Sequence, residues 1–380
     1  MNKTFTSILA AAIMAAAIPA RAKNCPYIAK VHEFVPAPGQ FVHNVPQIPE
    51  GATYEEALAL ASECLVSTEE PNPGMVSLGA FGGYVVFAFD HPVVNVAGEY
   101  DVKIYGNAFI SSAQTGGGSC EPGIVMVSVD ANGNGLPDDP WYEIKGADFD
   151  GKARQENYTV TYYKPAADHT AVTSPGNPAI IDAEYIRYTS NNPDDAEGYV
   201  MQNMYHRQSY WPSWLPGSPQ TLTFTGTRLP NTAQDISGNG SYWWQPFFEW
   251  GYADNLPAAQ DPGIKLEWAV DASGKPANLA KADFFKVYTA QQQQCGWLGE
   301  TSTEVCGAED LHPDAKPGAG IGEIEADTTF GDPSDPFGDS SDGSSATPVY
   351  YTLQGVRIAS PLPGTVCIRV ASGKAEKIRF

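Results

Sequence analysis

The segment that decides the fold runs Gly123-Ile-Val-Met-Val-Ser-Val-Asp-Ala-Asn-Gly-Asn-Gly-Leu-Pro-Asp-Asp-Pro-Trp-Tyr-Glu-Ile-Lys145. Its two ends are short and rich in β-branched and aromatic residues, which is typical of strands. Its middle is a run of Asn, Gly and Asp, which is typical of a tight turn. The segment therefore predicts a strand, a loop and a second strand.

The loop places short oxygen-bearing side chains at alternate positions, so that all of them can point at one ion. Gly135 permits the sharp turn, and the Leu136 carbonyl falls where such loops use a backbone oxygen. Calcium takes roughly six to eight oxygen ligands, and the loop contains no Cys or His that would favour zinc or copper. We predict a structural calcium ion here; the predicted ligands are Asp130, Asn132, Asn134, Leu136 and Asp138.

The loop departs from the EF-hand pattern, because its twelfth position is Trp141 and not a bidentate Glu, and no helical pattern flanks it. Its spacing resembles the short calcium repeats of thrombospondin type 3 modules. The alternative is a solvated hairpin turn that holds no metal.

Similar strand patterns recur along the chain, separated by Gly, Pro, Asn and Asp turns. One helix is predicted at Tyr54–Leu65, after Thr53 as its N-cap. Strands this frequent, without helices between them, predict an all-β fold, an antiparallel sandwich of jelly-roll type. The other predicted strands are Val76–Gly79, Gly82–Asp90, Tyr100–Tyr105, Tyr158–Tyr163, Thr221–Thr225, Gly263–Val270 and Asp283–Tyr288.

Composition divides the chain into four parts. Residues 1–22 have a basic start, a short apolar run and an Ala-Arg-Ala cleavage site, which predicts a signal peptide for export. Residues 23–312 form the sandwich, with a long irregular insertion at about 165–220. Residues 313–347 are rich in Gly, Pro, Asp and Ser, which predicts a disordered acidic linker. Residues 348–380 return to short strands, and no segment after the signal is apolar enough to cross a bilayer.

Charge and cysteine content narrow the function classes. The formal net charge of −22 argues against nucleic-acid binding, since an acidic surface repels phosphate backbones. The chain has 6 cysteines, and an even count in an exported protein predicts disulfides. Cys25–Cys64 and Cys295–Cys306 are the predicted pairs because they are near in sequence, although six cysteines allow fifteen pairings.

Residues 74–312 resemble a family of secreted and surface β-sandwich proteins of gut Bacteroidetes. The resemblance rests on Val76-Ser-Leu-Gly-Ala-Phe-Gly-Gly83, Glu121-Pro-Gly-Ile-Val-Met-Val127, the predicted calcium loop and Trp250-Gly-Tyr-Ala-Asp-Asn255. Some members accompany outer-membrane uptake systems, including those for corrinoids. The resemblance implies a secreted or surface-displayed protein of a Gram-negative bacterium, exported through the periplasm, that captures a nutrient without turnover.

The C-terminal residues resemble the sorting domain of type IX secretion substrates. The similarity lies in Leu353-Gln-Gly-Val-Arg-Ile358 and in the basic end at Lys377-Ile-Arg-Phe380. It implies recognition by a secretion machinery. The alternative is a small β-hairpin appendage.

Aromatic residues gather between positions 199 and 250. Aromatic faces stack on sugar rings or on flat macrocycles, so this cluster predicts a site for a glycan or a corrinoid such as cobalamin. Core packing is the alternative, because large sandwiches also fill their interiors with Trp and Tyr. The predicted ligand-binding residues are Tyr205, His206, Tyr210, Trp211, Trp214, Tyr242, Trp243 and Trp244.

No catalytic motif is present, so we predict a calcium-stabilised binding protein and not an enzyme. Two alternatives remain. An acidic run at Glu300, Glu304, Glu309 and Asp310, together with Glu121, could supply the carboxylate pair of a carbohydrate-active hydrolase. The protein could instead be a structural adhesin or a protein-interaction module.

Overall fold

The computed structural model describes residues 23–316, 349–351, 357–358, 366–371 and 374–379. The chain divides into two compact units, Met1–Pro317 and Gly318–Phe380. The predicted signal peptide and nearly all of the predicted linker lie outside the described residues.

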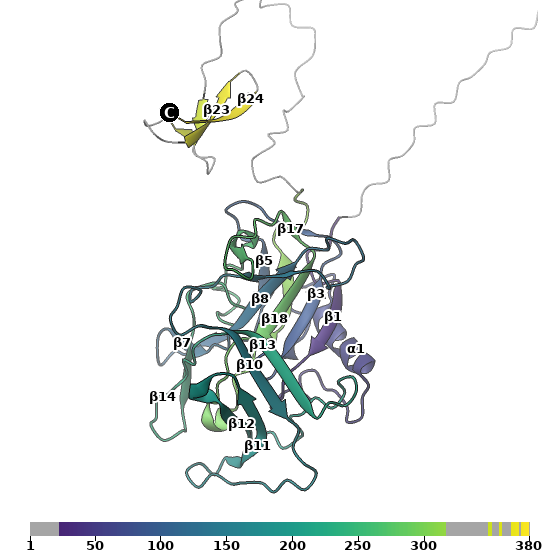
Figure 1. Ribbon diagram of the computed structural model, residues 1–380, viewed down its shortest axis with the longest axis vertical. Helices are drawn as coiled ribbons and strands as arrows, with labels where there is room; N and C mark the ends of the chain where they lie inside the picture. The colour runs from purple at the N-terminus through teal and green to yellow at the C-terminus, as the bar shows by residue number, and fades with distance from the viewer. Residues whose placement is uncertain (1–22, 317–348, 352–356, 359–365, 372–373, 380) are drawn as a thin grey trace, which may run out of the picture. The chain divides into compact units, whose positions relative to one another are not determined.

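A six-stranded antiparallel sheet is the centre of the first unit (Figure 1). Its strand order is β1-β3-β18-β8-β9-β16, so strands from the beginning, middle and end of the unit lie side by side. These strands are β1 (Lys30–Val35), β3 (Tyr84–Ala88), β18 (Phe284–Thr289), β8 (Gly123–Ser128), β9 (Trp141–Ile144) and β16 (Ala269–Val270).

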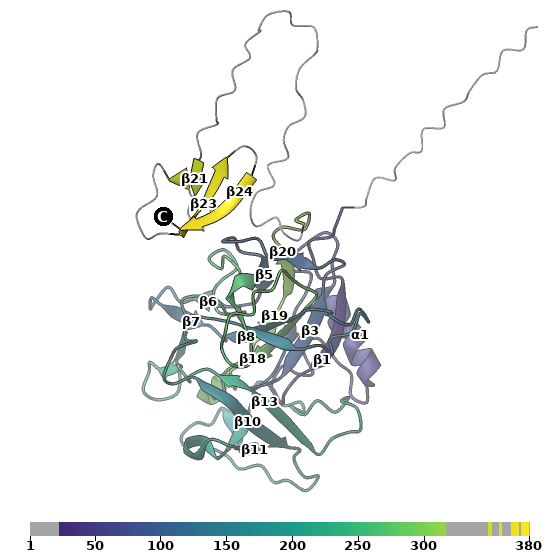
Figure 2. The ribbon, with the colours of Figure 1, turned by 45° about the horizontal axis from the view of Figure 1, so that its top comes forward.

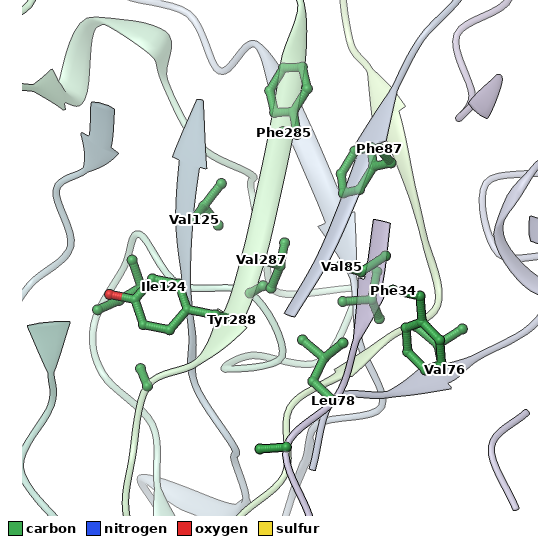
Figure 3. Packing of buried hydrophobic residues seen from close by; sticks show 14 of the residues in the cluster. Phe34, Val76, Leu78, Val85, Phe87, Ile124, Val125, Phe285, Val287 and Tyr288 are labelled. Carbon is green, nitrogen blue, oxygen red and sulfur yellow. The ribbon is translucent and has the colours of Figure 1, made fainter. Parts of the chain in front are cut away.

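Core residues lie on both faces of this sheet, and Figure 3 shows those of β3, β8 and β18. Phe285 and Val287 alternate along β18, and both are fully buried. Phe285 pairs with Phe87 of β3 on one side and with Val127 of β8 on the other. The period of two places these two residues on one face, whereas Phe284 and Tyr288 of β18 are buried on the other.

A second antiparallel sheet lies across one end of β8 and β18 in both ribbon views (Figures 1 and 2). Its order is β12-β11-β10-β13. Its strands are β10 (Gln155–Tyr163), β11 (Ile180–Ser190), β12 (Glu197–Asn203) and β13 (Thr221–Arg228). β11 and β12 fall inside residues 165–220, so the prediction of an irregular insertion there was wrong. Parts of β11 alternate buried with partly buried residues, whereas β12 buries only Val200 and Asn203, so the sequence shows no strict period of two here.

The remaining strands of the first unit form small sheets at its edges. One four-stranded sheet has the order β14-β15-β7-β6, and three further sheets are the pairs β17-β4, β19-β2 and β20-β5. Their bounds are β2 (Val76–Ser77), β4 (Val93–Val94), β5 (Val102–Tyr105), β6 (Phe109–Ile110), β7 (Gly117–Ser119), β14 (Gln234–Asp235), β15 (Trp243–Pro246), β17 (Lys281–Ala282), β19 (Glu304–Val305) and β20 (Gly307–Asp310).

The predicted helix is present as α1 (Tyr54–Leu65), which packs beside β1 (Figure 2). Thr53 accepts a hydrogen bond from the Glu56 amide, and Glu56 reaches back to the Thr53 amide, which makes a complete capping box. Ala57, Ala61 and Leu65 face the core. Among the described residues, no helix is both long and apolar enough to cross a membrane.

Three short 3₁₀ helices interrupt the loops: η1 (Pro193–Asp195), η2 (Leu266–Trp268) and η3 (Gly296–Leu298). The strand predicted at Gly263–Val270 was wrong over most of its length, because η2 occupies its centre; Ile264 forms a single bridge with Val102 of β5, and β16 at the end pairs with β9. The other predicted strands are present, so the all-β, antiparallel prediction is confirmed. The finer jelly-roll topology stays a prediction.

The second unit contains one antiparallel sheet of order β22-β21-β23-β24. The strands are β21 (Val349–Tyr351), β22 (Arg357–Ile358), β23 (Val366–Ala371) and β24 (Lys374–Arg379). The short strands predicted here are therefore present. The sorting function stays a prediction.

Neither predicted disulfide forms. Cys25, Cys64, Cys120, Cys295 and Cys306 all carry free thiols. Cys295 precedes η3, with its Sγ 3.9 Å from Thr301 Oγ1, whereas Cys306 lies between β19 and β20, where its amide donates to the Tyr105 carbonyl. Nearness in sequence misled the prediction, because the chain folds back between these two cysteines.

Candidate functional site

The predicted calcium loop is an exposed connection between β8 and β9. The Asp130 carboxylate accepts hydrogen bonds from the amides of Asn134 and Gly135, both at 3.0 Å. Asp138 closes the loop, with its two carboxylate oxygens 3.0 and 2.9 Å from the side-chain amides of Asn132 and Asn134. Four of the five predicted ligands thus converge through their side chains.

The donor set of this loop fits a hard cation. The converging groups carry only oxygen and amide nitrogen, and turning the two Asn amides around would present their oxygens toward Asp138. Gly133 and Gly135 have φ of 73° and 71°, which lets the backbone curl around the centre. Hydrogen bonds from the two Asn amides lower the pKa of Asp138, so its carboxylate is ionised at neutral pH. The oxygens present could therefore hold calcium.

The predicted aromatic ligand site does not form one surface. Tyr210, Trp211, Trp214 and Trp244 are 8% exposed or less, and the first three belong to the hydrophobic core. The indole nitrogens of these three Trp residues are buried without a hydrogen-bond partner. Buried rings cannot stack on a ligand, so for these four residues the core-packing alternative is correct.

The other predicted residues lie partly at the surface. Tyr205 is 62% exposed and meets Trp297 edge-on at 5.5 Å between ring centroids. These two rings line a shallow hollow of about 390 Å³ whose other walls are mainly Asn, Gly and Ser. His206 packs edge-on against Phe41, and burial lowers its pKa. Tyr242 is 41% exposed, whereas Trp243 is half-buried.

A groove between the two large sheets has a volume of about 400 Å³. One wall comes from β8, β9 and β18, and the other from β13 and the start of β10. The lining includes Tyr84, Trp141, Phe149, Thr223, Thr225 and Lys286.

The groove combines aromatic rings with hydroxyl groups. Trp141, at the start of β9, and Phe149, in the loop after β9, are both half-buried. Thr223 and Thr225 project from the exposed face of β13, and their hydroxyls bond to Thr161 and Thr159 of β10 at 2.8 and 2.9 Å. Because these threonines are held by a neighbouring strand, the groove is a preformed surface of rings and hydroxyls.

Close packing joins the two sheets beneath the groove. The Tyr288 hydroxyl of β18 accepts from the Thr227 amide at 2.9 Å and donates to the Thr227 carbonyl at 3.2 Å. A methyl group at Gly226 would lie 3.1 Å from the Tyr288 ring. The sheets can approach this closely because β13 has no side chain at that point.

Most charges of the groove compensate one another. The Arg154 guanidinium is 2.7 Å from a Glu143 carboxylate oxygen and 2.6 Å from one of Glu156. Glu143 also accepts the Thr227 hydroxyl at 2.8 Å. Both glutamates are therefore engaged by Arg154.

The calcium loop and the groove share the same hairpin. The loop leaves β8 at Ser128 and returns at Trp141, and these two residues are Cα partners in the ladder. The Asp130 amide donates to Asp283, one residue before β18, at 2.9 Å. An ion in the loop would therefore stiffen the connection that holds Trp141 in the groove wall.

A separate carboxylate cluster lies inside the first unit. One carboxylate oxygen each from Glu121, Asp254 and Glu304 lie within 4.8 Å of one another. Burial raises the pKa of Glu121 to about 7 and raises the pKa values of Asp254 and Glu304 well above their ordinary range. Backbone amides satisfy part of the cluster, since Asp254 accepts from the amides of Asn107, Ala108 and Glu304.

Glu300 is a fourth buried acid near this cluster. One of its oxygens accepts the Gln40 amide at 2.7 Å, and the other has no hydrogen-bond partner. Burial raises the pKa of Glu300 to about 8. The sequence showed that Glu121 and Glu304 are both acidic but did not show that they lie close together. The structure brings them together. These acids, which could share protons or hold a cation, line neither the groove nor the Tyr205 hollow.

Comparison with known proteins assigns no family. No protein-family model matches the chain, and no curated protein matches it at a significant level. The resemblance to a Bacteroidetes surface family therefore stays a prediction.

Sequence reasoning missed the groove because its residues come from separate segments. Tyr84, Trp141, Phe149 and Lys286 are not close together in the chain. One signal was available in the sequence. Lys286 is a charged residue inside the apolar strand β18, at a position where an outward-facing side chain is expected.

Proposed function

We propose that the first unit is a calcium-stabilised, non-enzymatic glycan-binding module whose site is the groove between the two large sheets. The observation that carries this proposal is the combination of Trp141 and Phe149 with the ordered hydroxyls of Thr223 and Thr225 in one concave surface. Aromatic rings stack on the apolar faces of sugars, and fixed hydroxyls orient the sugar hydroxyls.

The size of the groove favours sugars over a corrinoid. Its volume of about 400 Å³ is at the lower end of the roughly 300–1,000 Å³ range of small-molecule sites. One or two sugar rings fit such a space, whereas a corrin macrocycle with its nucleotide loop is considerably larger. Corrinoid capture is the narrower function implied by the family resemblance. The binding test below therefore includes cobalamin as an alternative ligand.

Binding without turnover is favoured by the distribution of the acids. A glycosidase needs one carboxylic acid that is protonated at working pH and a second that is ionised. The groove glutamates, Glu143 and Glu156, are both held by Arg154. The acids with raised pKa values, Glu121 and Glu300, are buried elsewhere. The acids with raised pKa values therefore lie outside the groove.

Calcium has a structural role in this proposal. Asp130, Asn132, Asn134, Asp138 and the Leu136 carbonyl would hold the ion and fix the β8–β9 connection beside Trp141. The net charge of −22 would raise the local concentration of divalent cations. Export to the cell surface and interaction with uptake or secretion machinery belong to the same proposal, and they rest on the signal-like N-terminus and on the resemblances.

The test is a glycan-array screen of the purified protein in calcium, with cobalamin in a parallel binding assay. We expect binding to one glycan class and loss of that binding in Trp141→Ala. The matched control is Trp268→Ala, because Trp268 packs against Trp250 and does not line the groove. Binding that Trp141→Ala leaves unchanged, or binding of cobalamin alone, would refute glycan recognition in this groove.

A further inference from the structure

Lys286 is the one groove cation that the described residues leave without a close partner. Five charged residues line the groove. Arg154 is paired with Glu143 and Glu156, and Asp271 accepts hydrogen bonds from Ser273 and Lys275 within its own turn. Within the described part of the chain, the Lys286 ammonium makes no hydrogen bond or ion pair, so it is a cation without a direct partner, although the five charges of the groove sum to −1.

The position of Lys286 follows from strand alternation. Its neighbours Phe285 and Val287 point into the core, so Lys286 lies on the opposite face of β18, at the groove. Its ammonium nitrogen lies 4.2 Å from the ring centroid of Tyr84 and 5.1 Å from that of Trp141. Cation–π attraction to two rings therefore holds the charge in place.

Aromatic rings compensate this charge only in part. Burial lowers the pKa of Lys286, which means that its surroundings supply less stabilisation than water does. The Glu33 carboxylate opposes this effect from a distance, but it is occupied by the Tyr84 hydroxyl at 2.8 Å. An anion entering the groove would provide the charge-assisted hydrogen bonds that the ammonium lacks.

Resting on the glycan-binding function proposed above, we infer that the groove selects an acidic sugar and that Lys286 binds its carboxylate. In this arrangement the sugar ring stacks on Trp141, beside the ammonium, and its hydroxyls face Thr223 and Thr225. Because the whole chain carries a net charge of −22, a polyanion would be repelled at long range. The groove therefore suits a glycan with a single carboxylate, such as a terminal sialic or glucuronic acid.

The experiment compares each acidic sugar with its own neutral isostere. Calorimetric titration measures the affinity of sialyllactose and of a glucuronic-acid disaccharide, and then of the methyl ester of each. For the wild-type protein we expect the acid to bind at least about tenfold tighter than the ester, which is the order of size of one charge-assisted hydrogen bond. This preference should disappear in both Lys286→Met and Lys286→Gln. Two variants are used so that the test remains valid if one of them fails to fold.

Lys265→Met is the matched control. Lys265 also lies over a tyrosine and a tryptophan, at 4.9 Å from Tyr100 and 5.9 Å from Trp268, but it is paired with Glu267 and does not line the groove. This variant should keep the full preference for the acid.

Each remaining outcome contradicts a different part of the account. If acid and ester bind equally, or if the preference survives in both Lys286 variants, carboxylate recognition is refuted while glycan binding stands. If only phosphorylated sugars or cobalamin bind, and do so through Lys286, the anion is a phosphate and the acidic-sugar inference fails. If no glycan binds, the proposed function and the inference fail together.

Discussion

Whether a side chain of this protein is buried in the core or lines the groove depends on which strands pack against it, and the local sequence does not show this. Trp211 and Trp141 are both tryptophans in turn-rich segments, yet Trp211 is buried in the core and Trp141 lines the groove. The difference arises from which strands pack on each residue, and that is a property of long-range pairing. The convergence of Asp130, Asn132, Asn134 and Asp138 was easier to foresee, because they lie within nine consecutive residues, while calcium binding there stays a prediction.

Glu300 should make stability depend on pH. Its pKa in the folded protein is about 8, against an ordinary value of 4.5, so between these values the folded state binds a proton that the unfolded state has released. The free energy of unfolding therefore falls as pH rises through this window, and the contribution is fully lost above about pH 8. Denaturant unfolding at pH 5 and pH 9 should show a smaller fall for Glu300→Gln, by roughly 2–4 kcal/mol, since one pKa unit is worth about 1.4 kcal/mol.

Glu99→Gln is the control for this comparison, because Glu99 lies exposed in a turn. It should follow the wild type at both pH values. If Glu300→Gln shows the wild-type fall, the Glu300 carboxyl is not protonated in the folded protein at neutral pH.

Gly82 should be intolerant of a side chain for two separate reasons. Its φ is +87°, and a methyl group there would lie 2.3 Å from Phe224 Cβ. Gly51 has a similar φ of +81° but has nothing within 4 Å. We expect Gly51→Ala to cost about 1 kcal/mol through backbone strain and Gly82→Ala to cost roughly 3 kcal/mol or more, since overpacking adds about 1–3 kcal/mol. Equal costs in thermal unfolding would mean that β13 does not pack on Gly82 as described.

Secondary-structure elements were predicted correctly where regularly spaced apolar residues indicated a helix or a strand. The Thr53 N-cap of α1 and the apolar strands β3, β8 and β18 were all predicted from the sequence. β11 was missed because it contains Asp182, Glu184 and Arg187, charged residues that also suit a solvated loop, and Asp182 is itself buried. The pairing of β8 with β18, about 160 residues apart in sequence, could not be read from local pattern at all.

The loop between β8 and β9 should respond to calcium through Asp130. We expect Asp130→Ala to lower the melting temperature in calcium to that of the chelated wild type, because the loop loses a carboxylate that also accepts two backbone amides. The measurement is thermal unfolding in calcium and in chelator. A variant that still gains the wild-type increment from calcium would exclude this loop as the site.

Asp235→Ala provides the matched control for the loop. Asp235 also holds an exposed Gly- and Ser-rich turn, by accepting the amides of Ser237, Gly238 and Gly240. That turn repeats part of the pattern, with oxygen-bearing side chains at Asp235, Ser237 and Asn239, but Trp243 stands where the loop between β8 and β9 has Asp138. Because the closing carboxylate is missing, loss of Asp235 should destabilise the protein equally with and without calcium.

The first unit as a whole is held by packing and backbone pairing, not by cross-links. Its five cysteines are free, and burial raises the pKa values of Cys120, Cys295 and Cys306 to about 12. Buried thiols of this kind are protonated and unreactive at neutral pH. The disulfides were predicted from the export compartment and from the even cysteine count. Neither observation takes account of where each thiol lies in the fold.

Reducing agent should therefore leave the stability of the first unit unchanged. Thermal unfolding with and without a thiol reductant should give the same melting temperature. Loss of a native disulfide typically costs about 2–5 kcal/mol in a small secreted domain, so a marked decrease in the reduced sample would show that a cross-link forms in this unit.

The central claim is that ligand binds in the groove between the two large sheets, and hydrogen–deuterium exchange with and without the best glycan of the array tests it most directly. We predict that the glycan slows exchange in residues 141–145 of β9 and the following turn and in residues 221–228 of β13, which form opposite walls of the groove. Protection confined to residues 176–179 and 239–241, beside Tyr205 and Trp297, would contradict the claim and place the ligand in the other hollow.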